Sequence, residues 1–272
     1  MKRFAKDVLK TSLDAAFPKR CWHCDAQYLM PGLCGRQVGG EVAEANLFGE
    51  VMAEYLCPQC RQLYESVESP LCFQCGVPFV SQFSVDHLCN DCIKHPFDFT
   101  AARAAGLYNQ MLKSIIHIYK YHGRSELARP LGRLLWDAFH RFYDVKAFDL
   151  IIPVPLHWFR RMRRGFNQAA LLVHQWKKLA DLHGIAFDPK IICENRLYRC
   201  RHTAPQTGLG KRRRSDNLKN AFKVSSCIGM HDKCILLVDD VMTTGATVDA
   251  CAKVLKSAGA GQIKVLTLAR AV

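Results

Sequence analysis

The chain of 272 residues is 49% hydrophobic and 10% aromatic, which suffices for one large domain or two unequal ones. This composition excludes a disordered chain, and the absence of any apolar run of 18 or more residues excludes a membrane-spanning segment. The formal net charge of +14 favours a polyanionic ligand such as pyrophosphate or nucleic acid, with a solvated basic face as the alternative.

Residues 1–20 are predicted to form an N-terminal helix. Apolar side chains at helical spacing would occupy one face and lysines the other. We expect this helix to dock on the rest of the protein, with binding at a membrane surface as the alternative. The segment lacks the long apolar stretch of a secretory signal. The apolar positions are Phe4, Val8, Leu9, Leu13 and Phe17.

Residues 21–96 are dominated by cysteine. Eight of the 14 cysteines form four Cys-x-x-Cys pairs, and two such pairs can complete one tetrahedral zinc site. The sequence therefore predicts two structural zinc sites without an open coordination position. Zinc-binding thiols must stay reduced, which predicts a cytoplasmic protein. The expected ligands are Cys21, Cys24, Cys57, Cys60, Cys72, Cys75, Cys89 and Cys92.

The two halves of this cysteine-rich module differ in spacing. The pairs that begin at Cys72 and Cys89 have the spacing of a zinc-ribbon hairpin, whereas 32 residues separate Cys24 from Cys57. Cys34 lies in that insert and could compete as a ligand. A redox role is the alternative for any single pair, but four pairs in one short segment argue against it.

Residues 93–98 are expected to link the module to a domain over residues 97–272, in which strands and helices alternate. Such alternation predicts a parallel α/β sheet flanked by helices. Residues 194–219 are polar and basic without apolar periodicity, so we expect a long loop there. Strands are expected at 101–108, 148–154, 234–238 and 263–268, and helices at 111–121, 125–143, 166–183 and 247–257.

Two carboxylates and a threonine-rich turn follow the strand that ends at Val238. Asp239 and Asp240 would lie at a solvent-facing strand end, at the carboxyl end of the sheet where α/β proteins bind ligands. Carboxylates accept hydrogen bonds from the hydroxyls of a ribose. The N–H groups and hydroxyls of residues 243–247 can surround a phosphate where the next helix begins. Separately, these parts could be a solvated strand end and an ordinary helix start. Their order favours a ribose-phosphate site.

This segment resembles the phosphoribosyl diphosphate (PRPP) binding motif of type I phosphoribosyltransferases. Over nearly the whole chain, further motifs resemble the ComF family, and the insert between Cys24 and Cys57 is the main departure. The resemblance implies a type I phosphoribosyltransferase-like domain preceded by a double zinc ribbon. The motifs are Phe17-Pro18-Lys19-Arg20-Cys21, Lys120-Tyr121-His122-Gly123, Pro153-Val154-Pro155, Arg163-Arg164-Gly165-Phe166-Asn167-Gln168, Gln206 and Asn217-Leu218-Lys219-Asn220-Ala221-Phe222.

By this resemblance, PRPP is the expected ligand, and Mg²⁺ is expected to bind with it, held largely by the oxygens of PRPP itself. Three groups of residues would share the ligand. The ribose hydroxyls would contact Asp239 and Asp240, the 5′-phosphate would contact Thr243, Thr244, Gly245, Ala246 and Thr247, and the pyrophosphate would lie at Pro153, Val154 and Pro155 with Arg163 and Arg164 close behind.

Two short segments, residues 151–170 and 196–223, hold most of the excess positive charge. Trp158 and Phe159 lie among the arginines of the first segment and are expected either to stack on bases or to pack a helix on the sheet. Four histidines are interpreted as surface or packing residues rather than catalytic bases: His117, His122, His157 and His202. The nucleic-acid candidates are Arg160, Arg161, Arg199, Arg201, Lys211, Arg212, Arg213 and Arg214.

The ComF resemblance implies a cytoplasmic role in natural transformation, with single-stranded DNA as a partner. A helicase or DNA-uptake channel protein is a further expected partner, docked through the zinc module at the inner face of the membrane. Two alternatives are an active phosphoribosyltransferase on an unidentified acceptor and a regulatory protein that senses PRPP. The sequence identifies no catalytic residue, so enzymatic activity is left open.

Overall fold

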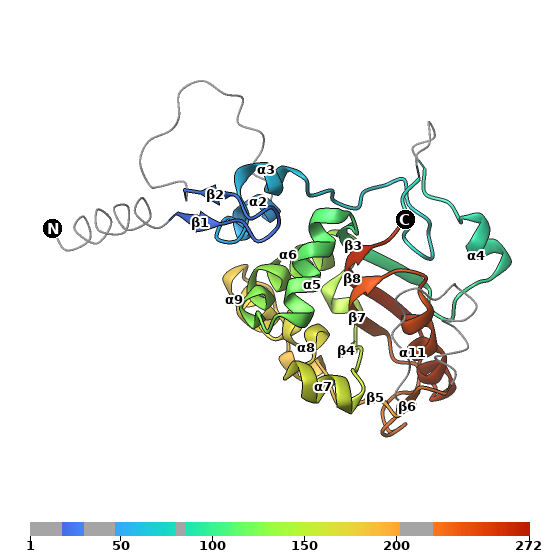
Figure 1. The fold of residues 1–272 in the computed structure, drawn as a ribbon. Helices are drawn as coiled ribbons and strands as arrows, with labels where there is room; N and C mark the ends of the chain where they lie inside the picture. Colours follow the sequence, from blue (N-terminus) through green and yellow to red (C-terminus); the bar gives the residue numbers. More distant parts are fainter. Residues whose placement is uncertain (1–17, 30–46, 80–84, 202–219) are drawn as a thin grey trace.

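A computed structural model describes residues 18–29, 47–79, 85–201 and 220–272 of the chain (Figure 1). The apolar positions of the expected N-terminal helix and the candidate ligand Cys34 lie outside these residues. So do Gln206, His202 and the basic residues Lys211, Arg212, Arg213 and Arg214. Among the described residues, no helix is both long and apolar enough to cross a membrane.

The centre of the molecule is a four-stranded parallel sheet with the strand order β3-β8-β7-β4. The two inner strands carry continuous runs of buried residues because helices cover both faces of the sheet. This arrangement confirms the predicted α/β class. The strands are β3 (Ala101–Leu107), β4 (Leu150–Pro153), β7 (Ile235–Met242) and β8 (Ile263–Arg270).

Alternate residues of β7 point into two hydrophobic cores. Leu236 and Val238 lie in the core beneath helices α5, α6, α8 and α9, whereas Ile235 and Leu237 lie in the core beneath α11. Figure 1 shows α5, α6 and α8 on one side of the sheet and α11 on the other. These helices are α5 (Gln110–Tyr121), α6 (Ala128–Phe142), α8 (Gln168–Val173), α9 (Trp176–Leu182) and α11 (Ala246–Ser257).

Three sequence expectations in this domain need correction. The single helix expected at 166–183 is divided into α8 and α9, because His174 N–H donates to Leu171 O, three residues back, instead of continuing the helical ladder. The helix expected at 125–143 begins with a 3₁₀ turn at Ser125–Leu127. The segment expected to be a loop from residue 194 contains β5 (Leu197–Arg199), which pairs antiparallel with β6 (Phe222–Val224).

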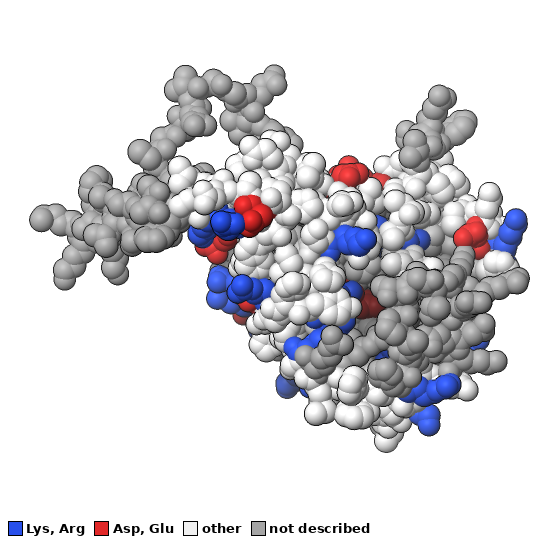
Figure 2. Space-filling model, viewed as in Figure 1, with Lys and Arg blue, Asp and Glu red and all other residues white. Residues whose placement is uncertain are grey.

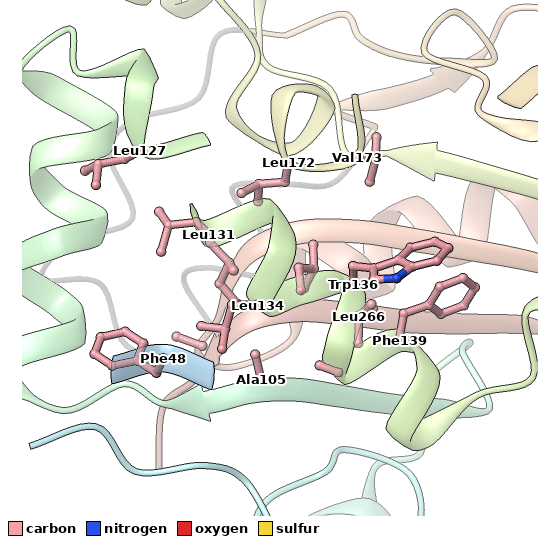
Figure 3. Close-up of a cluster of buried hydrophobic side chains, with 14 of the residues drawn as sticks. Phe48, Ala105, Leu127, Leu131, Leu134, Trp136, Phe139, Leu172, Val173 and Leu266 are labelled. Carbon is pink, nitrogen blue, oxygen red and sulfur yellow. The ribbon is translucent and has the colours of Figure 1, made fainter. Parts of the chain in front are cut away.

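The cysteine-rich module packs directly on the sheet domain. Phe48 shares the larger core with Leu134 of α6 and Ala105 of β3 (Figure 3). The module also hydrogen-bonds along β3, the edge strand, since Ala102 N–H donates to Gln74 O at 2.7 Å and Leu107 N–H donates to Glu65 O at 2.8 Å. It therefore covers an edge that would otherwise expose unpaired backbone groups.

The remaining elements are short. Figure 1 shows β1, β2, α2 and α3 above α6, and α7 near the carboxyl end of β4. The bounds are β1 (Lys19–Arg20), β2 (Gln27–Tyr28), α2 (Leu47–Val51), α3 (Pro58–Gln62), α4 (Asn90–Lys94), α7 (Trp158–Arg164) and the 3₁₀ turns Val145–Ala147 and Pro189–Ile191.

Candidate functional site

The eight paired cysteines form two clusters of four, as the sequence predicts. We call Cys21, Cys24, Cys57 and Cys60 the first cluster, and Cys72, Cys75, Cys89 and Cys92 the second cluster. Within each cluster the four Sγ atoms lie within 4.8 Å of one another. The Cys24–Cys57 and Cys75–Cys89 sulfur pairs are 3.8 Å apart, which matches the edge of about 3.8 Å expected for a tetrahedron with Zn–S bonds of about 2.3 Å. Both clusters fit structural zinc.

The electrostatics of the clusters also favour a bound cation. Burial disfavours the Cys72 thiolate, but backbone N–H groups that include those of Cys89 and Cys75 outweigh burial and lower the pKa of Cys72 to about 7. By contrast, burial and then the nearby sulfur atom of Cys89 raise the pKa of Cys92. Four thiolates this close together need a central positive charge, which zinc supplies.

The ribose-phosphate candidates lie where β7 passes into α11. We call Thr243–Thr247 the phosphate loop. Gly245 precedes α11 with a φ of 80°, in the left-handed region that favours glycine. A Cβ at this position would lie 3.0 Å from the ring of Phe97 and from the Cε of Met242. Only glycine therefore allows the loop to take this close-packed shape at the N-terminus of a 12-residue helix.

The carboxylates differ from expectation. The sequence suggested a solvent-facing strand end, but β7 continues to Met242 and pairs with β8 beyond both aspartates. Asp240 is buried and Asp239 is partly buried. Burial, and then the neighbouring charge of Asp240, raise the pKa of Asp239 to about 7.

Lys120 lies at the candidate site, although the sequence motifs assign it no role. Its Nζ lies 2.6 Å from Asp240 Oδ1, and little of either side chain is exposed. Burial disfavours the charged amine, but the attraction of Asp240 outweighs it and raises the pKa of Lys120. Helical periodicity gives no sign of this contact, and the only signal was the Lys120-Tyr121-His122-Gly123 motif.

The expected pyrophosphate segment lies beside the carboxylates. Val154 N–H donates to Val238 O, one residue before Asp239, at 2.8 Å. Arg164 donates to Gln168 Oε1 at 3.0 Å, and its guanidinium lies 4.7 Å from the centre of the Tyr121 ring, next to Lys120 in the chain. Strand β4 and helix α7 thus bring the predicted residues Val154 and Arg164 close to Asp239 and Lys120. The predicted segment comprises Pro153, Val154 and Pro155, and the side chain of Arg163 lies outside the described structure.

The nucleic-acid candidates are exposed, buried or outside the described side chains. On α7, Arg161 is exposed, as are Trp158 (62%) and Phe159 (51%), so these two rings do not pack the helix on the sheet. By contrast, Arg199 is buried with its guanidinium 5.3 Å from the centre of the Phe222 ring. In the view of Figure 2, Lys and Arg are more widely spread than Asp and Glu over the described part of the molecular surface. Arg201 is exposed, and the side chain of Arg160 is not described.

The histidines agree with their interpretation as packing or surface residues where the structure describes them. His157 is buried, and its ring nitrogen accepts from Phe159 N–H at 3.3 Å at the start of α7. His117 and His122 are exposed, with ring centres 5.6 Å apart. None of these contacts marks a proton-transfer pair.

Comparison with known proteins gives consistent matches. Residues 49–93 match the double zinc ribbon domain. Competence protein F of Haemophilus influenzae is 35% identical over 220 residues, covering 79% of this chain and 90% of that protein. The DNA utilization protein YhgH of Escherichia coli K12 is 35% identical over 220 residues, with the same coverage of each chain. Competence protein ComFC of Bacillus subtilis is 29% identical over 254 residues, which cover 88% of this chain and 93% of that protein. With these matches and its double zinc ribbon, the chain belongs to the ComF family.

Proposed function

We propose that this protein binds PRPP at the carboxyl ends of β4 and β7 and acts with single-stranded DNA in DNA uptake or utilization. One arrangement carries the proposal: Asp239 and Asp240 lie near the carboxyl end of β7, and the phosphate loop begins directly after that strand and leads into α11. The printed names of the relatives, competence protein and DNA utilization protein, support the cellular role.

The chemistry of a ribose phosphate suits this arrangement. Ionised Asp239 and Asp240 can accept hydrogen bonds from two neighbouring hydroxyls, and such charge-assisted bonds are stronger than neutral ones. The phosphate loop supplies backbone N–H groups and the positive end of a helix dipole to a dianionic phosphate. Lys120 and Arg164 provide positive charge nearby, and Mg²⁺ would bind with the pyrophosphate oxygens.

Single-stranded DNA is proposed to bind along α7. Bases stack on exposed aromatic rings, and phosphates pair with arginines, so a helix that exposes both can hold a single strand without reading its sequence. Trp158 and Phe159 meet edge to face, with ring centres 5.9 Å apart, and Arg161 is exposed on the same short helix. The net charge of +14 would strengthen this binding at low salt.

Calorimetric titration with PRPP and Mg²⁺ tests the ligand. Changing both Asp239 and Asp240 to Asn should weaken binding by about 2–4 kcal/mol, roughly 30- to 1,000-fold, because two charge-assisted hydrogen bonds are lost. Asp149→Asn is the matched control, since Asp149 lies at the amino end of β4 and pairs with Lys233. Equal affinity in the double variant and the wild type would place the ligand elsewhere.

A further inference from the structure

Arg270, the last residue of β8, joins the second cluster to the phosphate loop. Its Nε donates to the backbone oxygen of Cys75 at 3.0 Å, and its Nη1 donates to Thr243 O at 2.6 Å and to Met242 O at 3.3 Å. A guanidinium is a rigid planar fork, so the positions of its acceptors are fixed relative to one another. A shift of the Cys75 carbonyl would therefore move the start of the loop.

Gln74 provides a second connection. It lies inside the Cys72–Cys75 turn, where its side chain accepts from Phe97 N–H at 3.2 Å and donates to Phe97 O at 3.1 Å. The ring of Phe97 in turn packs against Gly245, so closely that a Cβ there would lie 3.0 Å away. The same cysteine turn is thus linked to the phosphate loop twice, to Thr243 through Arg270 and to Gly245 through Phe97.

The loop borders a pocket on this side. A cavity of about 570 Å³ separates the second cluster from the loop, with walls formed by Cys89, Phe97, Thr244 and Arg270 among others. In the described structure, Arg270 and Phe97 bridge this space between the second cluster and the loop. A Cys₄ site with zinc carries a charge of about −2, which attracts the guanidinium that holds Thr243.

We propose that zinc in the second cluster positions the phosphate loop through Arg270 and Gln74, so that phosphate binding at the loop depends on zinc in that cluster. The inference rests on the proposed binding of PRPP. Because coupling between two sites is reciprocal, PRPP must raise the affinity of the second cluster for zinc by the same factor. The first cluster lies in the core with Phe48 and Met52, so the coupling should not extend to it.

The test uses the full chain with both zinc ions and two matched arginine variants. Arg270→Gln removes the fork that reaches the loop. Arg103→Gln is the control, since Arg103 donates to Phe73 O at 3.1 Å and to Cys72 O at 3.4 Å in the same turn without a contact to the loop. PRPP affinity is measured by calorimetry, and zinc release to a chelating dye is followed with and without PRPP.

In the wild type and in Arg103→Gln, PRPP should slow the release of one zinc ion by about tenfold and leave the other unchanged. Arg270→Gln should still hold two zinc ions, bind PRPP about tenfold more weakly, and lose the effect of PRPP on zinc release. Arg270→Lys should behave like Arg270→Gln, because a lysine keeps the charge but not the fork.

Each contrary result has a distinct meaning. If wild-type protein with two zinc ions fails to bind PRPP, the proposed function and this inference both fall. If it binds PRPP but Arg270→Gln binds equally well, or if PRPP leaves zinc release unchanged, the coupling alone is overturned. Cys92→Ser, compared with Cys24→Ser in the first cluster, checks the result by removing each zinc site in turn. The coupling requires the larger loss of PRPP affinity in Cys92→Ser.

Discussion

Lys120 of α5 and Asp240 of β7 form a largely buried ion pair with a separation of 2.6 Å. The pair lies beside Asp239, so three ionisable groups meet at the proposed ribose site. Lys120 pairs with Asp240, whereas burial and then the neighbouring charge of Asp240 raise the pKa of Asp239 to about 7. Near neutral pH, Asp239 is therefore only partly ionised.

Replacing Lys120 by Met should destabilise the protein by about 3–5 kcal/mol, because the change leaves Asp240 buried without its partner. Urea unfolding at a single pH measures the loss. Lys113→Met, at an exposed position of the same helix, should change stability little, and an equal effect of the two variants would argue against a structural role for the pair.

Asp239 should make the protein less stable as pH rises from 6 to 8. Its pKa is raised from 3.8 to about 7 in the folded protein, so the folded state binds more protons than the unfolded state over this window. Stability then falls with rising pH until the folded carboxyl has ionised. Asp239→Asn removes the titrating group and should flatten this part of the profile. The measured quantity is the difference in unfolding free energy between the wild type and Asp239→Asn at each pH, because any effect of pH on zinc binding is common to both proteins. Parallel profiles of stability against pH would contradict the raised pKa.

Removal of zinc should expose more than the cysteine-rich module. We expect about two zinc ions per freshly purified, reduced chain, counted by mass spectrometry. After chelation, hydrogen exchange should accelerate within residues 47–79 and also at Ala102 and Leu107 of β3, whose N–H groups donate to the module. Exchange in β7 should change less, because β7 pairs only with β4 and β8 in the described sheet. A metal content near zero would overturn the zinc assignment.

Changing Trp158 and Phe159 together to Ala should weaken binding of single-stranded DNA at least tenfold, since each stacked base contributes about 1–3 kcal/mol. The dependence of binding on salt should stay constant, because neither ring is charged. Arg161→Ala should instead reduce the salt slope by roughly one unit. Fluorescence anisotropy with a labelled oligonucleotide measures affinity and slope.

Phe73→Ala provides the control for the aromatic pair, since this exposed ring belongs to the cysteine-rich module and lies outside α7. Similar affinities for Phe73→Ala and the Trp158/Phe159 double variant would show that the DNA does not stack on α7. Loss of binding in both would indicate a surface that extends over the module.

The sequence by itself determined the local features of the protein. Cys-x-x-Cys spacing defined eight ligands because a tight turn already brings two thiolates together, and the structure groups these ligands into the predicted clusters. The apolar run before Asp239 identified a strand buried on both faces. Gly245 marked a close approach that a side chain would prevent. Each of these signals depends on residues near one another in the chain.

Only the tertiary structure decided which distant residues meet. Arg270 and Cys75 are 195 positions apart, and no periodicity or motif links them. The depth of Asp239 and Asp240 was misjudged because pairing between β7 and β8 continues past the apolar run, and strand length depends on the neighbouring strand as well as on hydrophobicity. Likewise, the partner of Asp240 followed from where α5 packs on the sheet, which brings Lys120 to β7.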